Sequence, residues 1–163
     1  MHIKLKNKKL YFSNYKVKCA IGKRGISRKK REGDGCTPKG TFKFKYLLYR
    51  KDKTFKIRSN LKKIVINKNM GWCDDPNSNF YNKLIKFPFI HSAEKLYKKE
   101  SIYDIILVID YNLKPVLKNK GSAIFLHIAK KNYSPTKGCV AISKKDMKLL
   151  LAFINKKTKL IVC

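Results

Sequence analysis

Short apolar runs separated by frequent turns constrain this chain to a mainly β fold. Apolar and polar residues alternate along Thr41–Tyr49, which is typical of a strand with one buried face. Similar patterns predict further strands at 3–5, 10–12, 17–21, 62–66, 102–111, 123–129 and 158–162, the first two forming a hairpin around 6–9. The sequence therefore predicts a mainly β, sandwich-like single domain over residues 1–163 with one or two packed helices.

Two segments predict the helices. Ser143 and Asp146 fit a capping box, and a helix ending near Asn155 would carry one apolar face, formed by Met147, Leu150, Leu151 and Ile154. A shorter helix is expected from Ser92, as its N-cap, through Lys99. No internal repeat and no long linker divides the chain, which agrees with one domain.

The charge balance is strongly basic. Forty Lys and Arg residues against ten Asp and Glu leave a formal net charge of +30, which would attract any polyanion. The basic residues are mostly Lys and are spread along the whole chain, which favours a solvated Lys-rich surface. Nonspecific nucleic-acid binding is expected from charge alone, and a basic nucleic-acid-binding β domain remains an alternative.

Cysteine spacing and hydropathy indicate which cofactors to expect and which compartment would suit the protein. The five Cys and three His show no zinc-type spacing, so no metal and no cofactor is expected. Several free thiols would suit a reducing compartment. The N-terminus lacks the continuous apolar region of a signal peptide, and no apolar run approaches the ~18 residues that span a bilayer. We therefore expect no transmembrane segment.

The stretch from Gly121 to Ser143 carries the chemistry. The apolar run Ala123–Leu126 ends at His127, and a polar loop then leads to Gly138 and Cys139. A thiol with an ordinary pKa of ~8.5 becomes a nucleophile when an imidazole takes its proton. Gly138 allows close backbone approach, and the amides of Gly138 and Cys139 would hold an oxyanion. The alternative is a pair of structural residues, since Cys is often buried.

Other polar and aromatic residues are candidates for substrate contacts. In the basic loop 22–35, Arg31 could pair with a carboxylate or phosphate, or could lie in solvent. Asp74 and Asp75 could receive an amino group, or could form an Asx-turn before Pro76. Trp72 could form the floor of a groove or belong to the core. His91 is a second candidate site residue whose alternative is a structural role.

Two motifs carry a family resemblance. Thr136-Lys137-Gly138-Cys139-Val140, preceded by His127, resembles the (Ser/Thr)-x-Gly-Cys-(Ile/Val) signature of L,D-transpeptidases, the YkuD-type domain. Thr37–Phe42 looks like their Thr-Pro-x-Gly-x-Phe segment, and three internal blocks look like those of one proteobacterial subgroup: 71–76, 81–82 and 103–104. The chain departs from many members at Lys137, where they have His, and at Ala141, where they have Arg.

The resemblance implies a β-fold enzyme that acts on the peptide stems of peptidoglycan, without a cofactor. Cys139 would attack a stem carbonyl, with His127 as base and Gly138 at the oxyanion. The residues expected to contact the substrate are Thr136, Tyr133, Arg31, Trp72, Asp74 and Asp75. Carbapenem-type inhibitors are expected to acylate the enzyme. A hydrolytic relative, L,D-carboxypeptidase or amidase, is the alternative. The substrate implies the periplasm or cell envelope, whereas the missing signal peptide favours the cytoplasm.

Overall fold

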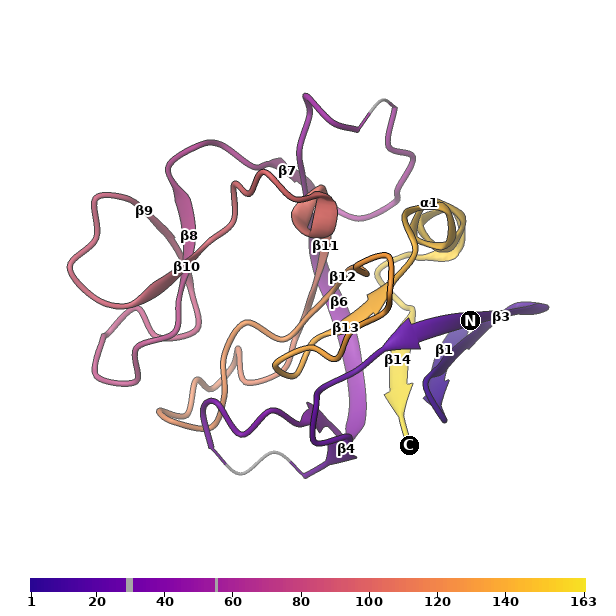
Figure 1. The fold of residues 1–163 in the computed structure, drawn as a ribbon, viewed down its shortest axis with the longest axis horizontal. Coiled ribbons are helices and arrows are strands. Elements are labelled where there is room, and N and C mark those ends of the chain that lie inside the picture. The colour runs from indigo at the N-terminus through magenta and orange to yellow at the C-terminus, as the bar shows by residue number, and fades with distance from the viewer. Residues whose placement is uncertain (29–30, 55) are drawn as a thin grey trace.

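The computed structural model, which describes residues 1–28, 31–54 and 56–163, is mainly β (Figure 1). Residues 29 and 30 of the basic loop lie outside the described residues. The strands are β1 His2–Lys6, β2 Lys9–Phe12, β3 Tyr15–Ala20, β4 Ile26–Ser27, β5 Thr37–Pro38, β6 Gly40–Tyr49, β7 Lys63–Val65, β8 Met70–Cys73, β9 Leu84–Lys86, β10 Ala93–Lys95, β11 Ile105–Ile109, β12 Phe125–Ile128, β13 Val140–Ile142 and β14 Lys159–Val162. A 3₁₀ turn, η1, spans Ser101–Tyr103, and the helix α1 spans Lys144–Phe153.

The main sheet has the strand order β11-β12-β13-β3-β2-β1-β14-β6-β7, and β6 also pairs with β11. That extra pairing joins β11, at one end of the order, to β6, next to the other end, so the strands from β11 to β6 close around an apolar core. The predicted N-terminal hairpin is present as β1 and β2, which pair in antiparallel fashion. Buried residues alternate with exposed or half-buried ones along β1, β2 and β14, whereas every residue of β8, β11, β12 and β13 is buried. The central position of β11 explains its continuous apolar sequence.

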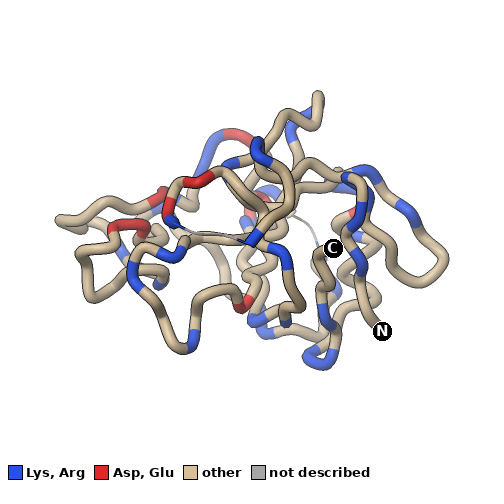
Figure 2. Tube along the Cα trace, turned by 90° about the horizontal axis from the view of Figure 1, so that it is seen from below, with Lys and Arg blue, Asp and Glu red and all other residues tan. Residues whose placement is uncertain are grey.

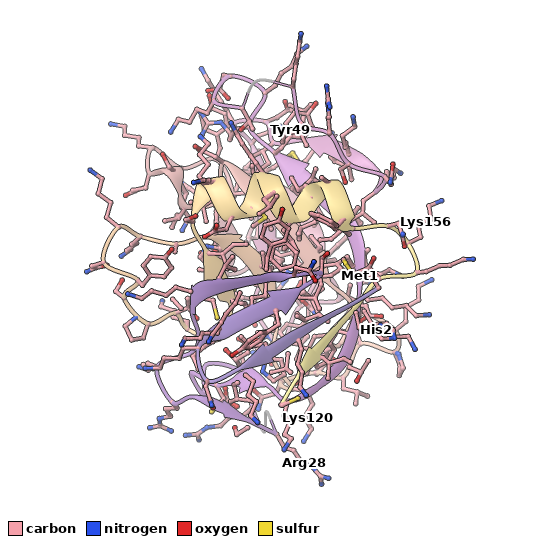
Figure 3. All side chains as sticks on the ribbon, turned by 90° about the vertical axis from the view of Figure 1, so that its right-hand side faces the viewer. Met1, His2, Arg28, Tyr49, Lys120 and Lys156 are labelled. Atoms are coloured by element: carbon pink, nitrogen blue, oxygen red, sulfur yellow. The ribbon has the colours of Figure 1, made fainter. Side chains whose placement is uncertain are left out.

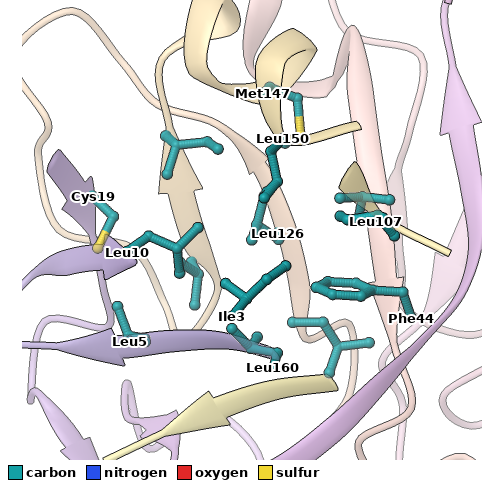
Figure 4. Close-up of a cluster of buried hydrophobic side chains, with 14 of the residues drawn as sticks. Ile3, Leu5, Leu10, Cys19, Phe44, Leu107, Leu126, Met147, Leu150 and Leu160 are labelled. Carbon is teal, nitrogen blue, oxygen red and sulfur yellow. The ribbon is translucent and has the colours of Figure 1, made fainter. Parts of the chain in front are cut away.

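The enclosed core is dominated by aliphatic side chains and is covered by α1 (Figure 4). Ser143 begins the helix as predicted, because its Oγ accepts a hydrogen bond from the Asp146 amide at 3.0 Å. The helix then buries Met147, Leu150 and Leu151 against Leu126 and other sheet residues. Burying apolar side chains removes them from water, so this core is the main source of the domain's stability.

A small side sheet in the order β10-β8-β9 lies beside the main sheet, on the left of Figure 1. The helix predicted from Ser92 to Lys99 is wrong, since Ala93–Lys95 forms β10 instead. Ala93 and Lys95 lie opposite Cys73 and Gly71 of β8. Cross-strand pairing satisfies these backbone groups, and this tertiary contact outweighs the local capping preference of Ser92.

Basic residues cover the molecule widely. Lys and Arg recur along the whole trace in Figure 2, whereas Asp and Glu occupy a few short stretches. Long side chains ending in nitrogen project outward around the domain in Figure 3. A solvated Lys-rich surface is therefore what the fold presents. Among the described residues, no helix is both long and apolar enough to cross a membrane.

Candidate active site

The parallel pairing of β12 with β13 brings His127 and Cys139 together. His127 lies opposite Ala141, two residues after Cys139. Cys139 directly precedes β13, and its Sγ accepts a hydrogen bond from the Phe125 amide at 3.4 Å. Both His127 and Cys139 line one pocket of about 620 Å³. Two residues twelve positions apart in the sequence thus share a site because their strands are neighbours.

His127 is buried, and its ring is held by a hydrogen bond to the backbone. Its Nδ1 lies 3.0 Å from the Ile128 carbonyl oxygen. A carbonyl only accepts, so Nδ1 donates its hydrogen there and Nε2 is the proton acceptor of the neutral ring. Burial lowers the pKa of His127 below 6.5, and hydrogen bonding to backbone carbonyls opposes that shift in part. The imidazole is therefore neutral at neutral pH, the form that a general base requires.

Two threonines hold the loop that carries the cysteine. Thr136 Oγ1 accepts a hydrogen bond from the Gly138 amide at 3.1 Å and donates to the Cys139 carbonyl at 2.6 Å. Thr37 Oγ1 donates to the Gly138 carbonyl at 2.9 Å and accepts from the Gly22 amide at 2.8 Å. Thr37 lies in the Thr-Pro motif, but its role was not predicted. The motif therefore places the buried Thr37 hydroxyl in hydrogen-bonding contact with the Gly138 carbonyl.

Gly138 is required by its backbone geometry. Its φ of +143° is disfavoured for residues with a side chain, and a Cβ there would lie 2.9 Å from the Cys36 carbonyl oxygen. Its amide already donates to Thr136 in this resting arrangement. Binding an oxyanion would require this bond to open, so the predicted oxyanion role of Gly138 stays a prediction.

Tyr103, Glu94 and Lys98 form a second polar group in the pocket that the sequence did not reveal. The Tyr103 hydroxyl donates to Glu94 Oε1 at 2.8 Å, and Lys98 Nζ lies 2.9 Å from the same oxygen. The Tyr103 ring meets the His127 ring edge-on, with centroids 5.3 Å apart. Burial, with the nearby Cys139 and Glu94, raises the pKa of Tyr103, which keeps it a neutral hydrogen-bond donor.

The two predicted aspartates separate in the structure. Asp74 lines the pocket, and its Oδ1 accepts from Ser92 Oγ at 2.6 Å. Asp75 forms the alternative Asx-turn, since its Oδ1 accepts the Asn77 amide at 2.9 Å. Its Oδ2 pairs with His91 Nδ1 at 3.0 Å. The Asn77 amide, and then His91, hold the pKa of Asp75 below its usual value, and neither Asp75 nor His91 lines the pocket.

Three other predicted contact residues do not line this pocket. Trp72 is 1% exposed and packs edge-on against Phe125, so it belongs to the core, the alternative left open by the sequence. The Tyr133 ring lies under Lys18 Nζ at 4.7 Å. Arg31 is exposed to solvent. Direct contact of these three with a substrate remains a prediction, whereas Thr136 does line the pocket.

Acidic residues are concentrated in the pocket despite the basic surface. Three of the ten acidic residues in the chain line it, together with four lysines: Glu32, Asp74, Glu94, Lys95, Lys98, Lys130 and Lys137. A separate hollow of about 550 Å³ has a mostly apolar lining, to which Asn67 and Lys86 also contribute, and contains neither Cys139 nor His127. In the described part of the chain, no group of three or more His, Cys, Asp and Glu could hold a metal ion.

Comparison with family models identifies the family of the chain. A comparison with curated proteins found no significant match. The family model of the L,D-transpeptidase catalytic domain, YkuD, matches residues 2–162. That match covers nearly the whole chain, including the Thr37 segment, His127 and Cys139, and it agrees with the mainly β architecture. The chain therefore belongs to the YkuD family of L,D-transpeptidase catalytic domains.

Proposed function

We propose that this protein is a peptidoglycan L,D-transpeptidase that uses Cys139 to form a thioester with a peptide stem. The observation that carries the proposal is that Cys139 and His127 line one pocket, with the His127 Nδ1–H bonded to the Ile128 carbonyl. A neutral imidazole oriented in this way can accept a thiol proton through Nε2. The family membership supports a cysteine nucleophile.

The reaction follows from these two side chains. His127 accepts the Cys139 proton, and the thiolate attacks the stem carbonyl, forming a carbon–sulfur bond. The amide carbon–nitrogen bond then breaks, and His127 returns the proton to the leaving amine. An amine of a second stem attacks the thioester and loses a proton to His127. The carbon–sulfur bond breaks, and the proton returns to Cys139.

The charges of the pocket suit a stem that contains a diamino acid. Such a peptide carries both an ammonium group and carboxylates. We propose that Asp74 and Glu94, which line the pocket, receive the ammonium group, and that Lys130 and Lys137, which also line it, receive a carboxylate. The proposed substrate lies in the cell envelope, so we propose that compartment as the site of action.

Intact-protein mass spectrometry after incubation with a carbapenem tests the nucleophile. We expect a single adduct that is lost in Cys139→Ala. Cys163→Ala is the matched control, because it removes an exposed thiol outside the pocket and should retain the adduct. An adduct spread over several cysteines would contradict the proposal.

Purified peptidoglycan fragments then test the acceptor. We expect cross-linked products when a second stem supplies the amine. Products of hydrolysis alone would identify an L,D-carboxypeptidase or amidase instead. If Cys139 forms no adduct and nucleic acid binds with a steep salt dependence, the basic-binding alternative would take precedence.

A further inference from the structure

The segment 121–125 lies directly against the Cys139 sulfur. The Cys139 thiol donates to the Ala123 carbonyl at 3.1 Å, and the Phe125 amide donates to Sγ at 3.4 Å. Two backbone groups of one short segment therefore contact the sulfur atom. The position of that segment determines where the nucleophile points.

Two consecutive side chains, Tyr81 and Asn82, hold this segment. The Tyr81 hydroxyl accepts a hydrogen bond from the Gly121 amide at 2.9 Å, and Asn82 Oδ1 accepts one from the Ala123 amide at 3.0 Å. Both residues are buried, at 1% and 2% exposure. Buried hydrogen bonds of this kind are costly to lose, because the remaining donor has no water to replace its partner.

Every polar atom of the Asn82 side chain is engaged. Oδ1 also accepts from Trp72 Nε1 at 2.9 Å. Nδ2 donates to the Tyr111 and Asn112 carbonyls at 3.2 and 2.7 Å. Because the amide nitrogen meets two carbonyls and the oxygen meets two N–H groups, only one orientation of the side chain satisfies all four contacts.

The backbone at both ends of this contact is unusual. Ala123 has a φ of +51° and Asn82 a φ of +56°, in the left-handed region. Asn tolerates that region, whereas Ala adopts it at a cost in free energy. Such a conformation persists only where the surrounding structure holds it, and the bond from the Ala123 amide to Asn82 is one such restraint.

We propose that Asn82 is a positioning residue for the nucleophile: its side chain holds the Ala123 peptide so that the Ala123 carbonyl receives the Cys139 thiol. This role rests on the proposed function, because it matters only if Cys139 is the attacking group. Asn82 does not line the pocket, so it acts through Ala123 and not on the substrate. The indole N–H of Trp72, in the core, donates a hydrogen bond to the same Oδ1 of Asn82.

Asn82→Gly is the main test, because glycine accepts the backbone conformation at φ +56° while the side-chain amide is removed. We expect carbapenem acylation to slow roughly 10- to 100-fold, since small displacements of a reacting group have effects of that size. With a stem substrate, kcat should fall while KM changes little, because the pocket lining is intact. A folded Asn82→Gly protein that is acylated at the wild-type rate would overturn the proposal.

Three variants separate positioning from general damage. Asn82→Asp keeps an oxygen acceptor for the Ala123 amide, and its protonated carboxyl can donate to one carbonyl, so acylation should recover to within a few-fold. Trp72→Phe removes the other donor to Oδ1 together with part of a buried ring system, and should slow acylation less than Asn82→Gly does. Asn7→Gly makes the same substitution at φ +51° in the exposed turn between β1 and β2 and should change nothing.

Hydrogen exchange in the wild-type protein tests the contact even if Asn82→Gly does not fold. We expect the Ala123 amide to exchange slowly, and its protection and the Cys139 reactivity to fall together in the variants. An Ala123 amide that exchanges as fast as an exposed loop would contradict the proposal. Absence of any adduct in the wild-type protein would instead overturn the proposed function itself, which distinguishes the two failures.

Discussion

The two faces of β11, β12 and β13 serve different purposes. On one face, Leu107, Leu126, Val140 and their neighbours join α1 and the N-terminal strands in a core of mainly aliphatic side chains. On the other face, Ile106, Val108 and Phe125 pack against Trp72 and Tyr103, and Cys139 borders this second cluster. His127 alternates with Leu126 and Ile128 along β12, so it belongs to the second face.

The second face contains aromatic side chains with polar ends. The indole N–H of Trp72 is bonded to Asn82, and the hydroxyl of Tyr103 is bonded to Glu94. These bonds tie the packing of the second face to the geometry of the site. We therefore expect changes on the first face to affect stability alone, and changes on the second face to affect catalysis as well.

Among substitutions on the second face, replacement of His127 should slow acylation most. His127→Gln removes the general base and should slow carbapenem acylation about 10²- to 10⁴-fold. His91→Gln, a histidine outside the pocket, is the control and should keep the wild-type rate. Stopped-flow or mass-spectrometric acylation rates measure both.

The pH dependence of the wild-type enzyme sharpens the role of His127. Because burial lowers the pKa of His127, the neutral base persists below pH 6.5 and the acid limb of the acylation rate should lie below that value. The stability of the domain also depends on this pKa. As the pH falls, His127 in the unfolded chain has the higher pKa and binds a proton before His127 in the folded protein does. The contribution of His127 is therefore complete above the unfolded pKa of about 6.5 and is lost as the pH falls through the folded pKa. An acid limb at or above pH 6.5 would contradict this assignment.

Two neighbouring alanine substitutions compare the faces directly. Leu107→Ala and Ile106→Ala each remove a fully buried side chain of β11 and should reduce the free energy of unfolding by about 2–5 kcal/mol. Under native conditions, Leu107→Ala should leave the acylation rate unchanged. Ile106 lies opposite His127 in the strand register, so Ile106→Ala should also slow acylation. Denaturant unfolding and acylation rates together test this difference. A Leu107→Ala variant that is folded but is acylated slowly would contradict it.

Thr37→Val tests the support beneath the Cys139 loop. The change keeps the side-chain shape but leaves the Gly22 amide and the Gly138 carbonyl without this partner, at a cost of about 1–3 kcal/mol. We expect acylation to slow as well, because the Gly138 peptide precedes the nucleophile. Thr158→Val, equally buried but next to β14, should lower stability alone. Equal acylation rates in the two variants would show that the Thr37 contact is purely structural.

Tyr103→Phe should have the smallest effect. It removes the hydrogen bond to Glu94 and keeps the ring against His127, so the loss of stability should be about 0.5–1.5 kcal/mol. Acylation should slow roughly two- to fivefold. By the conversion of rate into activation free energy, that is a smaller change than the loss of one full hydrogen bond. Tyr15→Phe, which removes the hydroxyl of an exposed tyrosine outside the pocket, should leave acylation unchanged. A similar change in acylation rate in both variants would show that the Tyr103 hydroxyl has no specific role at the site.

Local patterns were sufficient for most of the fold. Alternation along Thr41–Tyr49 predicted β6, and the Ser143 and Asp146 pair predicted the start of α1. The prediction failed at Ser92–Lys99, where a local capping signal was outweighed by pairing of β10 with β8. Pairing partners lie far apart in the chain, and a periodic pattern contains no information about them.

Residues close together in the chain were enough to predict the mainly β class, the helix, the family resemblance and the candidate pair His127 and Cys139. The contacts that hold the segments around this pair became visible only in the tertiary structure. Asn82 reaches Ala123 across 41 positions, and Thr37 reaches Gly138 across 101. Such contacts depend on how strands and loops are packed in space, and therefore on the complete fold and not on any single stretch of sequence.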